Sequence, residues 1–321
     1  MAASRKKSKP DLQGLVAACL ARHLEPGAHV RVAFSGGVDS VVLLHLLTRL
    51  AGAFPCTLSA MHVHHGLNPA AGTWAEFCLT FCERLGIPCA VERVKVPKKS
   101  AAGLEAAARQ ARYAALCKPG ADAVALAQHL DDQAETVLFQ LLRGGEPRAL
   151  AAMPEARVSE GMLLLRPLLN VPKAELIAYA RRHRLKWVED DSNLDTMLAR
   201  NALRQDVLPL LENHFPDYRE RLAGVARRMA EVAALLEHMA GEDRAAHPED
   251  ELDCNELKVL SETRARNLLA HFLRAQGAAV PRPAALREML RQLVEARGRL
   301  SLPLPGGRRL IRVKNKARIE P

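Results

Sequence analysis

The feature that most constrains the fold is an alternation of short apolar, strand-like runs with helix-like segments through about residue 200. Runs such as HVRVAFS (29–35) and DAVALAQ (122–128) are each followed by a segment with helical spacing. This pattern is typical of βαβ units, in which helices cover both faces of a parallel sheet. We therefore predict an α/β fold with a Rossmann-like parallel sheet, whose functional groups lie at the carboxyl ends of the strands.

The rest of the chain predicts a connecting helix and a small separate domain. Residues 217–239 repeat apolar residues at helical spacing, and the polar stretch GEDRAAHPEDE that follows marks a boundary. Beyond it we expect two amphipathic helices and a turn between short strands. The predicted domains are a catalytic domain at 1–215, a connecting helix at 216–245 and a small, mainly helical domain at 246–321.

Positive charge is concentrated near the end of the chain. The formal net charge is +10, and residues 262–321 alone hold 14 Lys and Arg against 4 Asp and Glu. This distribution indicates a polyanionic partner, and nucleic acid is favoured over an acidic membrane because no basic amphipathic helix carries Trp or Phe. A basic face that is merely solvated is the alternative interpretation.

Cysteine usage and hydropathy point to the cytoplasm. The seven cysteines are odd in number and form no CxxC pair, which argues against a disulfide framework or a thiolate zinc site. Cys78 and Cys82 are expected to pack on a helix face. The basic start is not followed by a signal-type apolar region, and the apolar runs are too short to span a bilayer. We expect a soluble cytoplasmic protein with no membrane partner.

The stretch SGGVDS (35–40) joins a strand-like run to a helix-like run and predicts an oxyanion site. Its glycines allow close backbone approach, and the N–H groups at the start of the helix point at the anion. The lysine of a P-loop is absent. Asp39 would repel a bare phosphate, so we expect a bridging Mg²⁺ ion. The residues predicted to bind the phosphates are Ser35, Gly36, Gly37, Val38, Asp39 and Ser40.

SGGVDS resembles the signature of the PP-loop group of ATP pyrophosphatases. Further motifs follow in the order and spacing of the tRNA(Ile)-lysidine synthase family, and they are HVHHGL, AQHLDDQAETVLFQLLRG, RPLL, WVEDDSN and ARNALR. The resemblance covers residues 30 to about 240 closely and the remainder more loosely. It implies an enzyme that uses ATP and free L-lysine to convert the wobble cytidine of tRNA(Ile) with a CAU anticodon into lysidine, releasing AMP and diphosphate.

The polar strand ends supply the predicted catalytic residues. We expect Asp39 and Asp132 to hold Mg²⁺, because their strands should end side by side. The resemblance implies that His129 lies near the α-phosphate or the adenylated base, and a structural histidine is the alternative. The planar guanidinium of Arg200 suits a phosphate or the adenylate. The predicted catalytic set is Asp39, His129, Asp132 and Arg200.

Further contacts to ATP and lysine are predicted around this set. His62 is expected at ATP, and a zinc site is not expected because His62 and His64 point away from His65 on a strand. Arg109 is the last residue predicted to bind ATP. For Arg109 and Arg112 the alternative is a surface ion pair with Glu105. The residues predicted to bind the lysine ammonium are Glu135 and Asp131, and helix capping is the alternative for Asp131 and for Asp132.

Arginines supply the predicted tRNA contacts. Aromatic residues make up only 4% of the chain, so we expect electrostatic docking with strong salt dependence, while the target base is splayed into the pocket. The predicted tRNA-binding residues are Arg112, Arg143, Arg204, Arg264, Arg266, Arg287 and Arg291.

Two departures from the family and two alternative functions accompany this interpretation. His64 stands where many members have aspartate. Longer members carry a further C-terminal domain, so we expect a short form or a truncated chain. A tRNA thiolase of the same group is one alternative, although many thiolases use CxxC pairs, and a non-catalytic RNA-binding relative is the other. A homodimer is possible.

Overall fold

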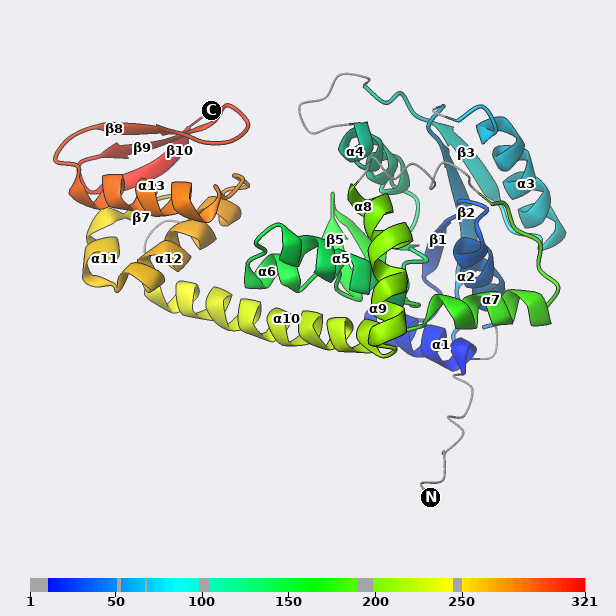
Figure 1. The fold of residues 1–321 in the computed structure, drawn as a ribbon. Helices are drawn as coiled ribbons and strands as arrows, with labels where there is room; N and C mark the ends of the chain where they lie inside the picture. Colours follow the sequence, from blue (N-terminus) through cyan, green and yellow to red (C-terminus); the bar gives the residue numbers. More distant parts are fainter. Residues whose placement is uncertain are drawn as a thin grey trace. The chain divides into compact units, whose positions relative to one another are not determined.

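The computed structural model describes residues 11–50, 53–66, 68–97, 104–189, 199–244 and 250–320. The chain forms two compact units, Met1–Arg227 and Arg228–Pro321, and the long helix α10 (Tyr218–Asp243) belongs to both (Figure 1). The domain boundaries predicted from the sequence, at residues 215 and 245, differ from this division into two units and stay a prediction. No helix in the described ranges is both long and apolar enough to cross a membrane.

The first unit is built on a six-stranded sheet of order β3-β2-β1-β4-β6-β5. All neighbouring strands are parallel except β5, which runs antiparallel to β6 at the edge. The chain order reverses between β1 and β4, and this topological switch point is where open α/β sheets bind ligands. The strands are β1 (His29–Ala33), β2 (Thr57–His64), β3 (Cys89–Arg93), β4 (Ala123–Ala125), β5 (Ala156–Ser159) and β6 (Met162–Leu165).

The Rossmann-like parallel sheet predicted from the sequence is confirmed, and the β5–β6 hairpin is an addition to it. Glu160 and Gly161 join these strands, and both have positive φ, at 52° and 75°. That geometry matches the two-residue turns that suit the twist of a hairpin. A glutamate before glycine is a weak turn signal, and strands of four residues give little periodicity, so the hairpin was not predicted.

Helices cover both faces of this sheet (Figure 1). Residues of α1, α2, α3 and α7 pack into one apolar core with β1 and β4, and residues of α4 pack on the opposite face. The helices are α1 (Leu12–His23), α2 (Val38–Thr48), α3 (Ala71–Arg84), α4 (Leu104–Leu116), α5 (Leu130–Leu142), α6 (Pro147–Leu150), α7 (Lys173–Arg182), α8 (Ala199–Ala202), the π-helical segment η2 (Leu203–Val207) and α9 (Leu208–His214). Pro172 is the N-cap of α7 rather than part of its first turn.

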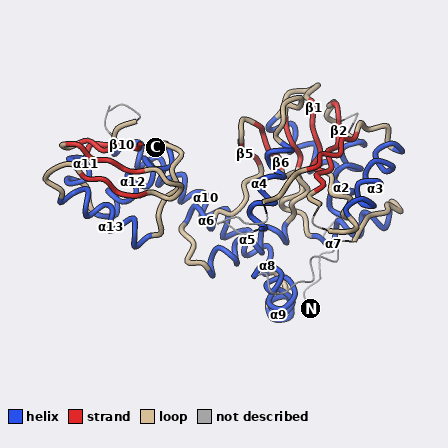
Figure 2. The backbone as a smooth tube through the Cα atoms, turned by 90° about the horizontal axis from the view of Figure 1, so that it is seen from above, coloured by secondary structure: helices blue, strands red, loops and turns tan. Residues whose placement is uncertain are grey.

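The second unit combines helices with a small sheet (Figure 2). Its four strands are antiparallel in the order β7-β10-β9-β8, and its core is separate from that of the first unit. The sequence predicted the helices and a turn between strands, but not the size of the sheet. The elements after α10 are β7 (Leu252–Asp253), α11 (Cys254–Val259), α12 (Glu262–Ala275), α13 (Pro283–Glu295), β8 (Leu300–Pro303), β9 (Arg309–Val313) and β10 (Lys316–Glu320).

Candidate active site

The turn after β1 requires glycine at its first position. Gly36 has a φ of 87°, and a Cβ atom added there would lie 2.9 Å from Cγ2 of Val188. The Val188 N–H donates to the Gly36 carbonyl at 2.9 Å, so this segment packs directly against the turn. At Gly37, by contrast, the closest contact of an added Cβ atom is the Ser35 hydroxyl at 3.4 Å. The two glycines therefore serve different purposes, with space needed at Gly36.

Amides and hydroxyls converge inside the turn. The Gly36 N–H donates to the Ser40 hydroxyl at 3.2 Å, and the Gly37 N–H donates to the Ser35 hydroxyl at 3.3 Å. The two hydroxyl oxygens are 3.1 Å apart. Helix α2 begins at Val38, and the first N–H groups of a helix have no acceptor within it. The N–H groups at the start of α2, beside the bonded glycine amides and serine hydroxyls, form a cradle of the kind that holds an oxyanion.

His129 lies among three carboxylates beside this cradle. Its Nε2 atom is 3.5 Å from Oδ2 of both Asp39 and Asp132, and its Nδ1 atom is 3.7 Å from Oδ2 of Asp131. Burial lowers the pKa of His129, but the hydrogen bond to Asp39 and the charges of the three aspartates outweigh it, so the pKa is raised. The expected juxtaposition of Asp39 and Asp132 follows from the pairing of β1 with β4.

The two carboxylates that meet at His129 differ in what they leave for a divalent cation. Asp132 already accepts from the His129 backbone N–H at 3.1 Å and from Arg204 at 3.4 Å. Oδ1 of Asp39 is buried and has no hydrogen-bond partner among the described residues, so a polar atom is left for a ligand. Within the same residues, no group of three or more His, Cys, Asp or Glu side chains could hold a metal ion. Mg²⁺ suits such a site, because it usually takes one or two protein carboxylates and completes its shell with substrate phosphates and water.

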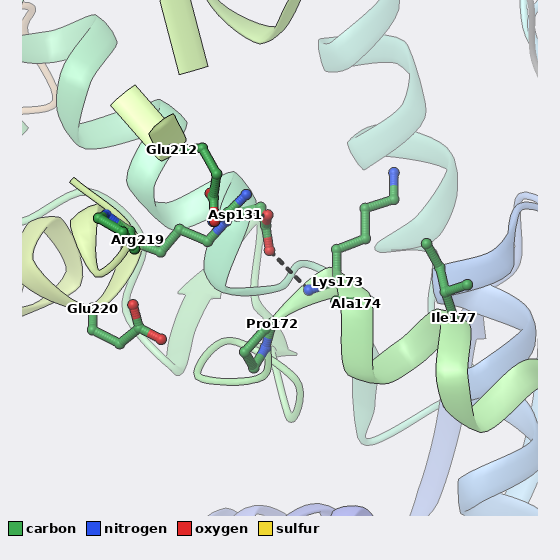
Figure 3. A pocket seen from close by; sticks show the side chains of 9 residues that line it. Asp131, Pro172, Lys173, Ala174, Ile177, Glu212, Arg219 and Glu220 are labelled. Carbon is green, nitrogen blue, oxygen red and sulfur yellow. Dashed lines mark hydrogen bonds and ion pairs between the residues drawn. The ribbon is translucent and has the colours of Figure 1, made fainter. Parts of the chain in front are cut away.

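Asp131 anchors two helices. Its Oδ2 atom accepts the Lys173 N–H at the start of α7 at 2.8 Å, and its Oδ1 atom accepts from Arg219 Nε of α10 at 2.5 Å (Figure 3). Burial raises the pKa of Asp131, but these donors, the charge of Arg219 and that of His129 bring it below its usual value. Beside Asp131 lies an open pocket of about 420 Å³, lined also by Lys173 and Glu212.

Glu135 is buried one helical turn after Asp131 and faces two arginines. Arg204 Nε donates to its Oε2 atom, and Arg200 Nε lies 3.5 Å from its Oε1 atom. Burial raises the pKa of Glu135, and the two arginines oppose this without cancelling it. Both carboxylates predicted to bind a lysine ammonium, Glu135 and Asp131, are thus paired with arginine here. Their role in lysine binding remains a prediction.

Comparison with known proteins identifies the family. The model of the PP-loop domain matches residues 9–211, and the model of the TilS substrate binding domain matches residues 252–317. The chain belongs to the PP-loop family. A tRNA(Ile)-lysidine synthase from Chromobacterium violaceum is 49% identical over 264 residues, which are 81% of this chain and 61% of that protein. The Nitrosomonas europaea protein of the same name is 43% identical over 297 residues, covering 91% and 65%.

The chain spans about 61–65% of the length of these curated relatives. Among solved structures, the U34-tRNA thiolase NcsA from Methanococcus maripaludis superimposes with a TM-score of 0.57 at 20% sequence identity. The match covers 69% of this chain and 78% of the thiolase. At that identity the likeness supports the PP-loop fold alone.

The histidines of the PP-loop domain differ in their surroundings. Nδ1 of His62 lies 3.0 Å from the Phe34 carbonyl and 3.4 Å from Sγ of Cys78, and burial lowers the pKa of His62. His62 therefore contacts Phe34, the residue that follows β1. Its contact with ATP stays a prediction. Burial and the nearby Arg112 lower the pKa of His65 to about 4.

Three of the predicted ATP- and tRNA-binding arginines lie on or next to α4 and α5: Arg109 and Arg112 on α4, and Arg143 at the C-cap of α5. The Arg109 guanidinium lies 5.1 Å from the ring centroid of Tyr113 and donates to its hydroxyl at 3.4 Å. The side chain of Glu105, the alternative partner of Arg109, falls outside the described residues, as does WVEDDSN beyond Glu189. Arg143 is exposed at the end of α5.

The four C-terminal arginines predicted to bind tRNA are held by acidic neighbours. Arg264 pairs with Asp243, and Arg266 and Arg287 both pair with Glu262. Arg291 pairs with Glu288 and Glu295. Arg287 and Arg291 form exposed pairs, which contribute little to stability, so a phosphate can replace the carboxylate. Arg264 differs, because the side chain of its partner Asp243 is only 2% exposed. Binding by these arginines remains a prediction.

Two arginines that support the site, one partly exposed and one buried, were missed from the sequence. Arg219 pairs with Asp131 although 88 residues separate them, and no local pattern signals this contact. Arg166 is fully buried, donates to the Pro154 carbonyl at 2.7 Å and bonds the Gln128 side chain, next to His129. Its place in the RPLL motif was the available signal.

Proposed function

We propose that this chain acts as a tRNA(Ile)-lysidine synthase, with ATP, free L-lysine and tRNA(Ile) bearing a CAU anticodon as substrates. The observation that carries the proposal is the meeting of Asp39, Asp132 and His129 beside the glycine turn, at the switch point of the sheet. Curated relatives that align with 81% and 91% of this chain bear this name. The proposed place of action is the cytoplasm, and a homodimer remains a prediction.

The proposed first step joins the cytidine to AMP. The carbonyl oxygen at C2 of the wobble cytidine attacks the α-phosphorus of ATP, an oxygen–phosphorus bond forms, and the bond to the leaving diphosphate breaks. We expect the amides of Gly36 and Gly37 and the hydroxyls of Ser35 and Ser40, which bond one another in this structure, to turn to the diphosphate as its charge develops. Mg²⁺ held by Asp39 and Asp132 would neutralise part of the phosphate charge.

In the proposed second step the ε-amine of lysine attacks C2, a carbon–nitrogen bond forms, and the bond from C2 to the AMP oxygen breaks. His129 lies 3.5 Å from both Asp39 and Asp132, and we expect its ring to contact the α-phosphate or the adenylated cytidine. Arg200 supplies a second cation for the departing AMP. The incoming lysine must lose its proton before attack, since a protonated amine is not a nucleophile.

A tRNA-dependent ATP cleavage assay tests this proposal. AMP and diphosphate should form in equal amounts only when ATP, Mg²⁺, lysine and tRNA(Ile) are all present. Asp39→Asn should lower the rate about 100-fold or more, because the Mg²⁺ ion that would neutralise the developing phosphate charge loses a ligand. The control is Asp217→Asn, which changes an exposed carboxylate outside the site. Sulfur transfer to the tRNA instead of lysine incorporation would favour the thiolase alternative.

A further inference from the structure

The ring of Phe139 contacts the guanidinium groups of two arginines, Arg143 and Arg200. It lies on α5 one turn after Glu135, is partly buried, and belongs to none of the described core clusters of buried apolar residues. The Arg200 guanidinium carbon is 5.4 Å from the centroid of its ring, and that of Arg143 is 5.2 Å from it. Cations at such distances are attracted by the electron-rich ring face.

The guanidinium of Arg200 contacts a carboxylate and an aromatic ring on one face of α5. Oε1 of Glu135 lies 3.5 Å from Arg200 Nε, and the centroid of the Phe139 ring lies 5.4 Å from the Arg200 guanidinium carbon. Residues four apart on a helix are neighbours, so the carboxylate and the ring form one continuous surface. Helix α8, which carries Arg200, lies beside α5 in both views (Figures 1 and 2).

The carboxylate of Glu135 is itself fixed. Its second oxygen accepts from Arg204 Nε, one helical turn after Arg200, and the side chain is only 4% exposed. Glu135 therefore cannot reorient without leaving its own buried carboxylate unpaired, which is costly. An ion pair with Glu135 alone would still allow the Arg200 guanidinium to rotate. The ring of Phe139 beside it restricts that rotation.

We propose that Phe139 is a positioning residue, which holds the Arg200 guanidinium in the orientation that meets the phosphate of ATP or of the adenylated cytidine. This inference rests on the proposed function, because Arg200 has its role only there. Phe139 itself touches no reacting atom. The ring is the essential feature, so tyrosine should replace phenylalanine, whereas leucine and methionine should not.

The first test observes Arg200 directly, without any activity measurement. In protein with ¹⁵N-labelled arginine, the Nε–Hε signal of Arg200 is assigned by its loss in Arg200→Lys. We expect this signal to shift and broaden in Phe139→Leu and to stay near its original position in Phe139→Tyr. Phe215→Leu removes an exposed ring from the end of α9 and is the matched control, which should leave the signal unchanged. An Arg200 signal that is unaffected by Phe139→Leu would overturn the proposal.

The second test separates turnover from binding. Phe139→Leu should lower kcat for AMP release about tenfold, while the KM for ATP stays within about twofold, because misorientation affects the transition state more than ground-state binding. Phe139→Tyr should restore kcat. If Phe139→Leu does not fold, Phe139→Met removes the ring and nearly preserves the volume.

A double variant shows whether Phe139 acts through Arg200. Adding Phe139→Leu to Arg200→Lys should cause less than a twofold further loss, since coupled residues are not additive. Losses that multiply would contradict the inference. If the wild-type protein has no lysine-incorporating activity, the proposed function fails, and the Arg200 signal still decides whether Phe139 orients that side chain.

Discussion

At the scale of single residues, the two glycines of the PP-loop turn are not equivalent. Gly36→Ala combines a positive φ with a contact of 2.9 Å to Val188, whereas Gly37→Ala meets only the Ser35 hydroxyl at 3.4 Å. We expect Gly36→Ala to lower the free energy of unfolding of the first unit by about 2–3 kcal/mol. Urea denaturation measures it, with Gly37→Ala as the matched variant, which should cost less than about 1 kcal/mol. Equal losses would contradict the close approach at Gly36.

His65 gives the stability a dependence on pH. Burial and the charge of Arg112 lower its pKa in the folded protein to about 4, from an ordinary value of 6.5. Between these values the unfolded chain binds a proton that the folded chain does not, so stability falls as pH falls. We expect His65→Gln to reduce the loss of stability between pH 6.5 and pH 4, measured by urea midpoints across that range.

The control for His65 is His214→Gln, at an exposed position at the end of α9. This variant should keep the pH dependence of the wild-type protein. A His65→Gln protein whose urea midpoints fall with pH as steeply as those of the wild type would show that His65 is not the group responsible.

At the scale of elements, Asp131 joins the start of α5 to α7 and α10. The side chains of Arg219 and Asp131 are 25% and 22% exposed, so their ion pair is more shielded from water than a surface pair. Arg219→Gln should lower the free energy of unfolding by about 1–2 kcal/mol, because the partly buried carboxylate loses its cation. The control is Arg221→Gln, two residues further on α10 and exposed. Equal stability of the two variants would show that the anchor contributes nothing.

The elements also show how far the sequence alone could lead. Apolar periodicity predicted the strands that flank the site, and the turn at SGGVDS together with the aspartates after β4 predicted the meeting of Asp39 and Asp132. The pairing of Arg219 with Asp131 could not be predicted, because it depends on where α10 begins relative to α5. Likewise, the sequence shows an acidic residue at Glu135 but does not show that Arg200 and Arg204 form ion pairs with it.

At the scale of the whole molecule, the basic excess of the second unit predicts binding to tRNA that depends on salt. Part of this charge is structural, because Arg312 is buried and donates to the Lys314 carbonyl at 2.7 Å. Arg287 is exposed and paired only loosely, with Glu262 at 3.2 Å. We expect Arg287→Gln to weaken tRNA binding and to reduce the slope of log K against log salt concentration by about 1.

Filter binding at several salt concentrations measures this slope. Val259→Gln is the control, since it changes an exposed apolar side chain of the same unit and removes no charge. A wild-type affinity that does not fall with salt would contradict electrostatic docking, and an unchanged slope for Arg287→Gln would remove this residue from the contact surface.

The most direct test of the central claim is incorporation of radiolabelled lysine into tRNA. The account predicts that the chain, given ATP and Mg²⁺, transfers label to tRNA(Ile) with a CAU anticodon and not to methionine tRNA with the same anticodon. Omission of ATP should abolish the transfer, because no adenylation occurs, and Asp39→Asn should slow it about 100-fold or more. Absence of label from tRNA(Ile) with every substrate present would contradict the account.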